Sequence, residues 1–235
     1  MMLEKIPFDS LGGADFGWLK AKHHFSFGRY IDRSRMGVGA LRVWNDDEID
    51  AGKGFEPHPH KDMEIVTYVR EGAITHRDSL GNEGRTGAGD VQFMSAGEGI
   101  THSEYNLEDR LTRLFQIWFV PRSAGGTPWW EARKFPPRAA GQGFVPLASG
   151  YDDHISDGAI AINSDAALLA AALNAGDAAT YDLAPGTEAY LVVAKGAVTV
   201  NGTALAERDA LQVSAEAVIS VAADADAEVL LAVLG

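Results

Sequence analysis

The stretch "GFEPHPHKDMEIVTYV", residues 54–69, places two histidines one residue apart directly before a run rich in β-branched residues. Such a run is typical of a β-strand. Because side chains alternate between the two faces of a strand, residues of equal parity point the same way. We therefore expect His58, His60 and Glu64 to face one side of a strand.

A second block of similar design follows at residues 97–106, "GEGITHSEYN", where His102 and Glu104 share a face. Glycine-marked turns separate the two blocks, as neighbouring strands require. The metal-competent side chains of both blocks can then converge inside one barrel. Imidazole nitrogens and carboxylate oxygens suit iron(II), manganese, nickel, copper or zinc.

A simpler interpretation makes His58-Pro59-His60 a solvated loop and lets His102 end a strand. For an isolated His-x-His that interpretation is the usual one. The second block argues against it, because the His-x-Glu pair lies where a neighbouring strand would bring it to the first block. The sequence therefore predicts a metal site, for which three histidines and one glutamate are the minimum.

Short β-type runs fill residues 37–120, among them "VGALRVW", "GDVQFM" and "RLFQIWFV". Turn clusters at 79–82 and 87–90 separate them. Short strands between glycine-rich turns predict an all-β sandwich or barrel. A helical interpretation fails because glycines interrupt every candidate helix.

The second half of the chain repeats the first. "EAYLVVAKGAVT" (188–199) aligns with "EIVTYVREGAIT" (64–75), and Asn201-Gly202 then provides a type I′ hairpin turn. An internal duplication explains this, giving two tandem barrels. Further on, "GDVQFMSAGEGITHSE" (89–104) aligns with "RDALQVSAEAVISVAA" (208–223). In these two alignments the second copy has lost the metal site, because three residues without imidazole correspond to His58, His60 and His102: Asp182, Ala184 and Val221.

Changes in composition and periodicity along the chain indicate the domain limits. Residues 1–125 form the first barrel with the metal site, and residues 158–235 form the second without one. Between them, residues 126–157 hold prolines, glycines and paired tryptophans without a period, which indicates a linker. The alanine-rich stretch 164–176 forms either a short helix or a strand with a turn, and propensity alone favours the helix.

The composition excludes several classes of protein. The 235 residues carry a formal net charge of −13, which disfavours direct binding to nucleic acid. No apolar run approaches the ~20 residues of a membrane helix, and the first residues lack a secretory pattern. A cytoplasmic protein is expected. Because cysteine is absent, thiolate metal sites and disulfides are excluded.

"HPHKDMEIVTYVREG" and "GDVQFMSAGEGITHSEYN" together resemble the two conserved blocks of the pirin family, and the resemblance covers roughly residues 20–121 well. It implies a bicupin, with one mononuclear metal, usually iron(II), in the N-terminal barrel. The implied ligands are His58, His60, His102 and Glu104. The general cupin pattern would nominate Glu64 instead, which we place beside the ligands. "TPWWEARKF" departs from the family after the first barrel, which puts entry to the pocket in doubt.

Pirins are similar to quercetin 2,3-dioxygenases, so the resemblance implies a metal-dependent enzyme that opens a flavonol or similar chelating polyphenol with O2. Either Glu104 or Glu64 would be the general base. The alternative from another class is a metal- or redox-sensing regulatory protein that acts through protein partners without turnover, and a third is a barrel that only binds metal. Fold alone does not decide between these. A monomer is expected, because a bicupin closes its own core.

Other conspicuous residues receive structural interpretations. His23 and His24 are expected to be satisfied by hydrogen bonds rather than to bind metal. His76 is predicted at the surface or rim of the barrel, and His154 in a solvated loop. The pair Trp129-Trp130 forms either a lid or partner-binding patch, or simply packs at a domain interface.

Overall fold

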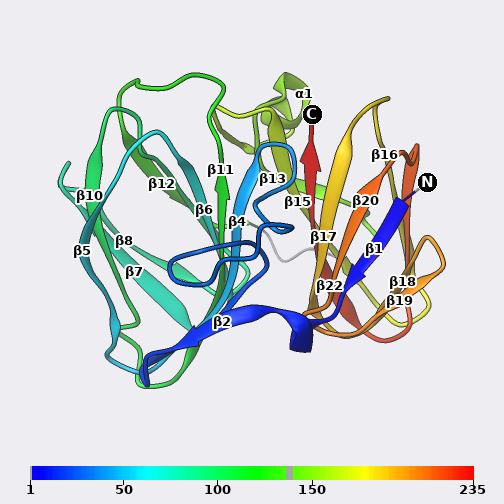
Figure 1. Cartoon of the computed structure of the whole chain (residues 1–235), viewed down its shortest axis with the longest axis horizontal. Helices are drawn as coiled ribbons and strands as arrows, with labels where there is room; N and C mark the ends of the chain where they lie inside the picture. The colour runs from blue at the N-terminus through cyan, green and yellow to red at the C-terminus, as the bar shows by residue number, and fades with distance from the viewer. Residues whose placement is uncertain (1, 136–139) are drawn as a thin grey trace. The chain divides into compact units, whose positions relative to one another are not determined.

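A computed structural model describes residues 2–135 and 140–235 (Figure 1). The chain divides into two compact units. The N-terminal barrel consists of residues 12–135 and 162–164. The C-terminal barrel consists of the described residues within 1–11, 136–161 and 165–235. Both units are built from strands, as the sequence predicts.

Two antiparallel sheets make the N-terminal barrel. The larger sheet has the order β12 (Trp129–Arg133), β9 (Val91–Ser95), β6 (Glu64–Glu71), β11 (Thr112–Phe119), β4 (Leu41–Ile49), β3 (Leu19–His23) and β2 (Gly12–Asp15). The smaller sheet has the order β5 (Gly54–His60), β10 (Ile100–Tyr105), β7 (Ala73–Asp78) and β8 (Glu83–Gly87). Apolar side chains from both sheets pack together: Ile49, Val69 and Leu114 from the larger sheet contact Ile74 from the smaller.

The C-terminal barrel has the same two-sheet construction. Its larger sheet has the order β1 (Met2–Ile6), β20 (Ala210–Ser214), β17 (Glu188–Lys195), β22 (Ala227–Leu234), β15 (Ala166–Leu173), β13 (Val145–Ser149) and β14 (Ile160–Ala161). Its smaller sheet has the order β16 (Ala178–Asp182), β21 (Val218–Ala223), β18 (Val198–Val200) and β19 (Thr203–Leu205). Two short helices complete this unit, η1 (Phe8–Ser10) and α1 (Asp152–Ser156). Among the described residues, no helix has the length and apolar character needed to cross a membrane.

Matching strands occupy matching places in the two units, which supports the duplication. The run β9-β6-β11-β4 in one corresponds to β20-β17-β22-β15 in the other (Figure 1). The predicted type I′ turn is present, because Asn201 and Gly202 both have positive φ and Val200 pairs with Thr203.

The predicted gapless register is wrong between the first two strands of each small sheet. His102 pairs with His58, but Val221 pairs with Ala179 rather than with Asp182. The connection after β5 comprises residues 61–63, whereas the one after β16 comprises residues 183–187. The longer connection shifts the pairing of the second copy.

The helix predicted within residues 164–176 is wrong. Residues Ala166–Leu173 form strand β15, which lies between β22 and β13 in the larger sheet. Most of its side chains are completely buried. Pairing on both edges and burial on both faces override the helix propensity of alanine and leucine.

The units also differ from the predicted domain limits. Strand β1 lies in the C-terminal barrel, because Met2–Ile6 pairs with β20, and the Phe8 N–H donates to the Asp209 carboxylate. The predicted linker contains β12, which pairs with β9 as an edge strand of the N-terminal barrel. Residues 136–139, in the middle of that predicted linker, lie outside the described residues.

Candidate metal centre

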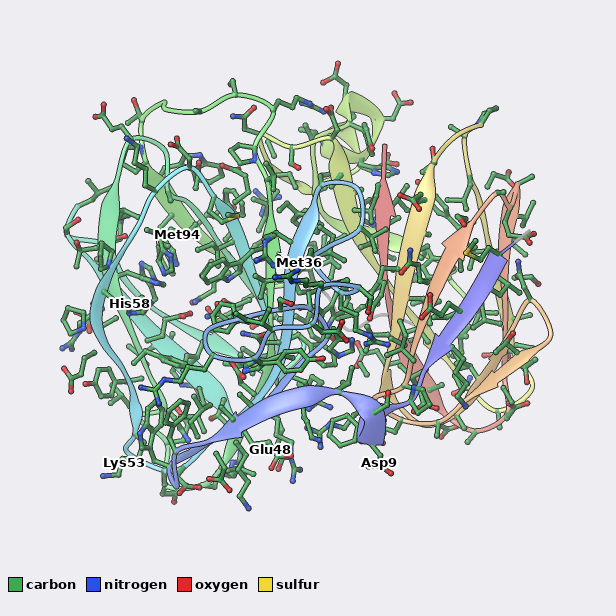
Figure 2. The ribbon with its side chains drawn as sticks, in the orientation of Figure 1. Asp9, Met36, Glu48, Lys53, His58 and Met94 are labelled. Atoms are coloured by element: carbon green, nitrogen blue, oxygen red, sulfur yellow. The ribbon has the colours of Figure 1, made fainter. Side chains whose placement is uncertain are left out.

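Three imidazoles converge inside the N-terminal barrel from two adjacent strands. His102 on β10 pairs directly with His58 on β5, and Ile100 pairs with His60. The Nε2 atoms of His58 and His102 lie 3.1 Å apart. The His60 ring centroid lies 4.8 Å from that of His58 and 4.9 Å from that of His102. Figure 2 shows His58 pointing from β5 toward the interior of the barrel.

The partners of these rings indicate which nitrogens are free to bind a cation. The backbone carbonyl of Glu56 lies 2.7 Å from His58 Nδ1, so this nitrogen carries the proton and Nε2 carries the lone pair. His102 Nε2 faces it, and His102 Nδ1 is engaged by His76 Nδ1 at 3.3 Å. Two lone pairs that face each other repel unless a cation lies beside them. This local arrangement fits a metal ion.

The electrostatics of the rings also suit metal binding. Burial, then the neighbouring His102 and His58, lower the pKa of His60 to about 4. Burial, then His58 and His76, lower the pKa of His102 to about 3. Both imidazoles are therefore neutral at pH 7, and neutral imidazole is the form that binds metal.

Glu104 is held in place by three side-chain donors. The Gln92 amide donates to Oε1 at 2.5 Å, Thr67 donates to the same oxygen at 3.3 Å, and the Gln116 amide donates to Oε2. The carboxylate is nearly completely buried. Its oxygens lie within 4.8 Å of ligand nitrogens of His76 and His102, whereas His58, His60 and His102 form a second such group. The predicted ligands thus fall into two overlapping sets that share His102.

Glu64 does not lie among these residues, contrary to the parity argument. The turn at 61–63 contains Asp62 with positive φ, and it sends β5 and β6 into different sheets. Thr67 points toward Glu104, so Glu64, three residues earlier on the same strand, points to the opposite face. There it accepts hydrogen bonds from Ser95 Oγ at 2.6 Å and the Asn163 N–H at 3.0 Å. Burial raises its pKa above the usual range, against these two hydrogen bonds.

The prediction of His76 at the surface or rim is wrong. Its side chain is completely buried on β7, beside Glu104 on β10. His76 Nε2 lies 3.0 Å from Asp78 Oδ2, and its ring stacks on Trp130 at 4.8 Å between centroids. The sequence argument excluded His76 because residues 62–72 were expected to decouple its strand from that of His60, whereas β7 reaches the site by pairing with β10.

Gln92 and Gln116 were missed by the sequence argument. Each lies in the middle of an apolar run, "VQFM" and "LFQIWF", at a position that faces the barrel interior. A lone polar residue on the inward face of a strand needs a buried partner. That signal was available and would have pointed to the carboxylate of Glu104.

The remaining histidines have structural partners. His23 Nδ1 lies 2.9 Å from Asn45 Oδ1, as expected of a satisfied core histidine. His24 is completely buried, with its ring 6.0 Å from that of Trp44. The prediction of a solvated loop for His154 is wrong, because this residue lies on α1, half-buried, with Nδ1 3.0 Å from Ser149 Oγ. Because α1 packs against β13, the side chain of His154 is partly shielded from solvent.

Comparison with known families and proteins agrees with this geometry. Residues 7–119 match the family described as Pirin, and residues 148–232 match the one described as Quercetinase C-terminal cupin domain. A pirin-like protein of Caulobacter vibrioides is 57% identical to the chain over 98% of both lengths. The chain belongs to the pirin family. This membership confirms the predicted resemblance and the fold of two tandem cupin barrels.

Two further relatives of this pirin bear on its chemistry. A protein of Escherichia coli strain K12 named quercetin 2,3-dioxygenase is 45% identical, over 94% of this chain and 93% of that one. The crystal structure of bacterial pirin YhhW from Escherichia coli in complex with nickel(II) has 43% identity and a TM-score of 0.93, over 99% of each chain. The donor set described above likewise fits a single divalent metal.

The paired tryptophans Trp129 and Trp130 lie inside the N-terminal unit. Both belong to β12, which pairs with β9. The Trp129 ring lies 4.8 Å from that of Phe93, and Trp130 covers His76. Trp130 therefore packs directly against the histidine cluster.

Proposed function

We propose that the protein is a metal-dependent dioxygenase that opens the ring of a flavonol or a similar chelating polyphenol with O2. The observation that supports this most directly is the set of inward-facing imidazole nitrogens of His58, His60 and His102 beside a buried carboxylate. The relative named quercetin 2,3-dioxygenase supports the choice of substrate class.

In this proposal His58, His60, His102 and Glu104 hold one divalent ion. When bound, the ion would supply a Lewis acid with coordination positions left for a chelating substrate and for O2. Nitrogen and oxygen donors without thiolate are compatible with iron(II), the metal we favour, and with manganese, nickel, copper or zinc.

Glu104 is the residue that we propose as general base. Its carboxylate would accept the proton of the substrate hydroxyl, while the amides of Gln92 and Gln116 keep it from rotating away. Glu64, the other predicted base, faces the opposite side of β6, where it accepts hydrogen bonds from Ser95 and Asn163. The position of Glu104 beside His102 therefore supports Glu104 rather than Glu64 in this role.

Aromatic side chains beside His60 suit a flat ligand. The Trp118 ring lies 5.0 Å from the His60 ring and meets it edge to face, and Phe27 packs against Trp118 at 5.4 Å. Flat aromatic surfaces favour stacked or edge-to-face contacts with a polyphenol ring.

The test is oxygen uptake with quercetin by metal-free protein reloaded separately with iron(II), manganese, nickel, copper and zinc. We expect uptake with at least one ion and none in the His60→Ala variant. His154→Ala is the matched control, because it removes a half-buried histidine from the C-terminal barrel, and it should retain activity.

If the wild-type protein binds metal tightly and no ion supports uptake with any flavonol, the dioxygenase proposal is wrong. The regulatory alternative would then be tested by searching for protein partners that bind only the metal-loaded form.

A further inference from the structure

A continuous line of hydrogen bonds leads from a buried carboxylate to the histidine cluster. Asp78 Oδ2 lies 3.0 Å from His76 Nε2, and His76 Nδ1 lies 3.3 Å from His102 Nδ1. The side chain of Asp78 has no exposed area, and His76 and His102 are buried as well. No water is therefore needed to connect the three residues.

The direction of these hydrogen bonds is fixed at the Asp78 end. Asp78 Oδ1 accepts the N–H groups of Leu80 and Asn82, and Oδ2 accepts the Asn82 side-chain amide. These donors favour the ionised carboxylate, which only accepts. His76 must then donate from Nε2, which leaves its Nδ1 as an acceptor.

The acceptor atom, His76 Nδ1, determines the tautomer of His102. His102 Nδ1 must donate to His76 Nδ1, so the lone pair of His102 is on Nε2, the atom that faces His58. We propose that Asp78 and His76 are positioning residues that fix the tautomer and orientation of His102 so that Nε2 is presented to the metal. This inference rests on the proposed metal-binding role of His102.

The surroundings of His76 hold its ring in one orientation. The Trp130 indole lies parallel to it, at an interplanar angle of 8°. Trp130 in turn fits against Gly84 on β8, where a Cβ atom would collide with the indole. The departure of "TPWWEARKF" from the family pattern therefore coincides with a contact that orients His76.

A second metal ion bound by His76, His102 and Glu104 is the competing explanation. It would require lone pairs on both nitrogens of His102 and hence an imidazolate. It would also place a second dication in the same buried interior, beside the first. Since the hydrogen-bonded line satisfies both ring nitrogens of His76 and the Nδ1 of His102 without an imidazolate, the structure favours positioning.

The Asp78→Asn variant tests the direction of the line. The side-chain carbonyl in this variant would take the place of Oδ1 and accept the same two backbone N–H groups. Its NH2 group would then face His76, so His76 Nε2 would have to act as the acceptor. His76 would then donate from Nδ1, and His102 would carry its proton on Nε2. Long-range ¹H–¹⁵N NMR of the metal-free protein reads these tautomers directly. We expect His102 to change from the Nδ1–H to the Nε2–H form.

The same variant should weaken metal binding. Loss of an outer partner of a metal ligand typically costs about 10–100-fold in affinity. We expect a loss in this range for nickel(II), measured by competition with a chromophoric chelator. His76→Phe, which keeps the stacking surface for Trp130 and removes the hydrogen bonds, should give a similar loss.

Asp209→Asn is the matched control, because Asp209 is also a buried carboxylate that accepts backbone N–H groups, but in the C-terminal barrel. It should leave both the tautomer and the affinity unchanged. An unchanged His102 tautomer in Asp78→Asn, or unchanged affinity in both site variants, would overturn the inference. So would two bound nickel ions per chain in the wild type that fall to one in His76→Phe. Neither readout needs turnover, so a failure of the dioxygenase proposal would be recognised separately.

Discussion

The interiors of the two barrels are built on the same strand order and filled in opposite ways. Between its sheets the N-terminal barrel contains imidazoles, a carboxylate and two amides. The C-terminal barrel contains one large apolar cluster, to which β16, β18 and β21 contribute Ala179, Val198, Val200, Ile219 and Val221. These are strands equivalent to those that carry the histidines and Asp78 in the first barrel.

The contrast shows how much supporting structure a buried polar site requires. Each ring nitrogen and carboxylate oxygen in the first barrel needs a partner, because an unpaired buried polar group costs roughly 1–3 kcal/mol. Thr67, Thr86, Gln92 and Gln116 meet that need around Glu104. The second barrel contains none of this network and gains its stability from apolar burial instead.

The largest expected effect that distinguishes the two barrels is the loss of metal binding in the His102→Ala variant. This change removes the residue shared by both donor sets, so affinity should fall by more than the roughly 100-fold expected for an outer partner. Chelator competition measures the loss. An affinity within a few fold of wild type would mean that the first barrel is not specialised for metal.

The converse experiment is Leu231→Ala in the C-terminal barrel. Leu231 is completely buried in the apolar cluster, so truncation should lower the free energy of unfolding by about 2–5 kcal/mol. Denaturant titration measures this change. Metal affinity of the folded variant should remain that of the wild type, and a parallel loss would show that the two interiors are coupled.

Gly84→Ala sharpens the comparison by changing only the packing against the histidine cluster. The new Cβ would collide with Trp130, and overpacking of this kind costs roughly 1–3 kcal/mol. Thermal unfolding of metal-free protein is the measurement. Gly87→Ala on the same strand is the control, because its Cβ meets nothing closer than 3.6 Å. Equal effects of the two changes would remove Trp130 from the explanation.

A pH dependence of stability is also expected to belong to the N-terminal barrel. Its pKa values of about 4 for His60 and about 3 for His102 lie below the ordinary value of 6.5. Between these limits the unfolded chain binds more protons than the folded one, so stability falls as pH is lowered through 6.5 and levels off below about 3.

Denaturant unfolding of metal-free protein at several pH values measures this slope. His60→Gln should make it shallower, because the substituted residue does not titrate. An equally steep slope in that variant would assign the dependence to groups elsewhere in the chain.

Sequence alone predicted the fold and the strands that carry the site. Alternation and glycine-rich turns were sufficient for the sheets, and the two His-containing blocks were sufficient to place His58, His60 and His102 on neighbouring strands. These features are local or depend on a single pairing between adjacent strands. They can therefore be predicted from short stretches of sequence.

The errors share a different cause, because each depends on what the chain does beyond a turn. Glu64 was assigned to the face of His58 across the turn at 61–63. His76 was excluded because residues 62–72 were expected to decouple its strand from that of His60. The strand Ala166–Leu173 was expected to be helical because alanine propensity says nothing of neighbours on both edges. Positions decided by sheet assignment cannot be obtained from parity within one segment.

The pairing of β1 with β20 has a consequence for biosynthesis. Met2 leaves the ribosome long before its partner Ser214 is translated. The residues at 162–164, one of which donates to Glu64, likewise follow the rest of the N-terminal barrel. Domains generally fold in the order in which they emerge. Here the nascent chain must keep β1 unpaired until β20 has been synthesised, so release of the chain before that point would leave β1 without its partner strand.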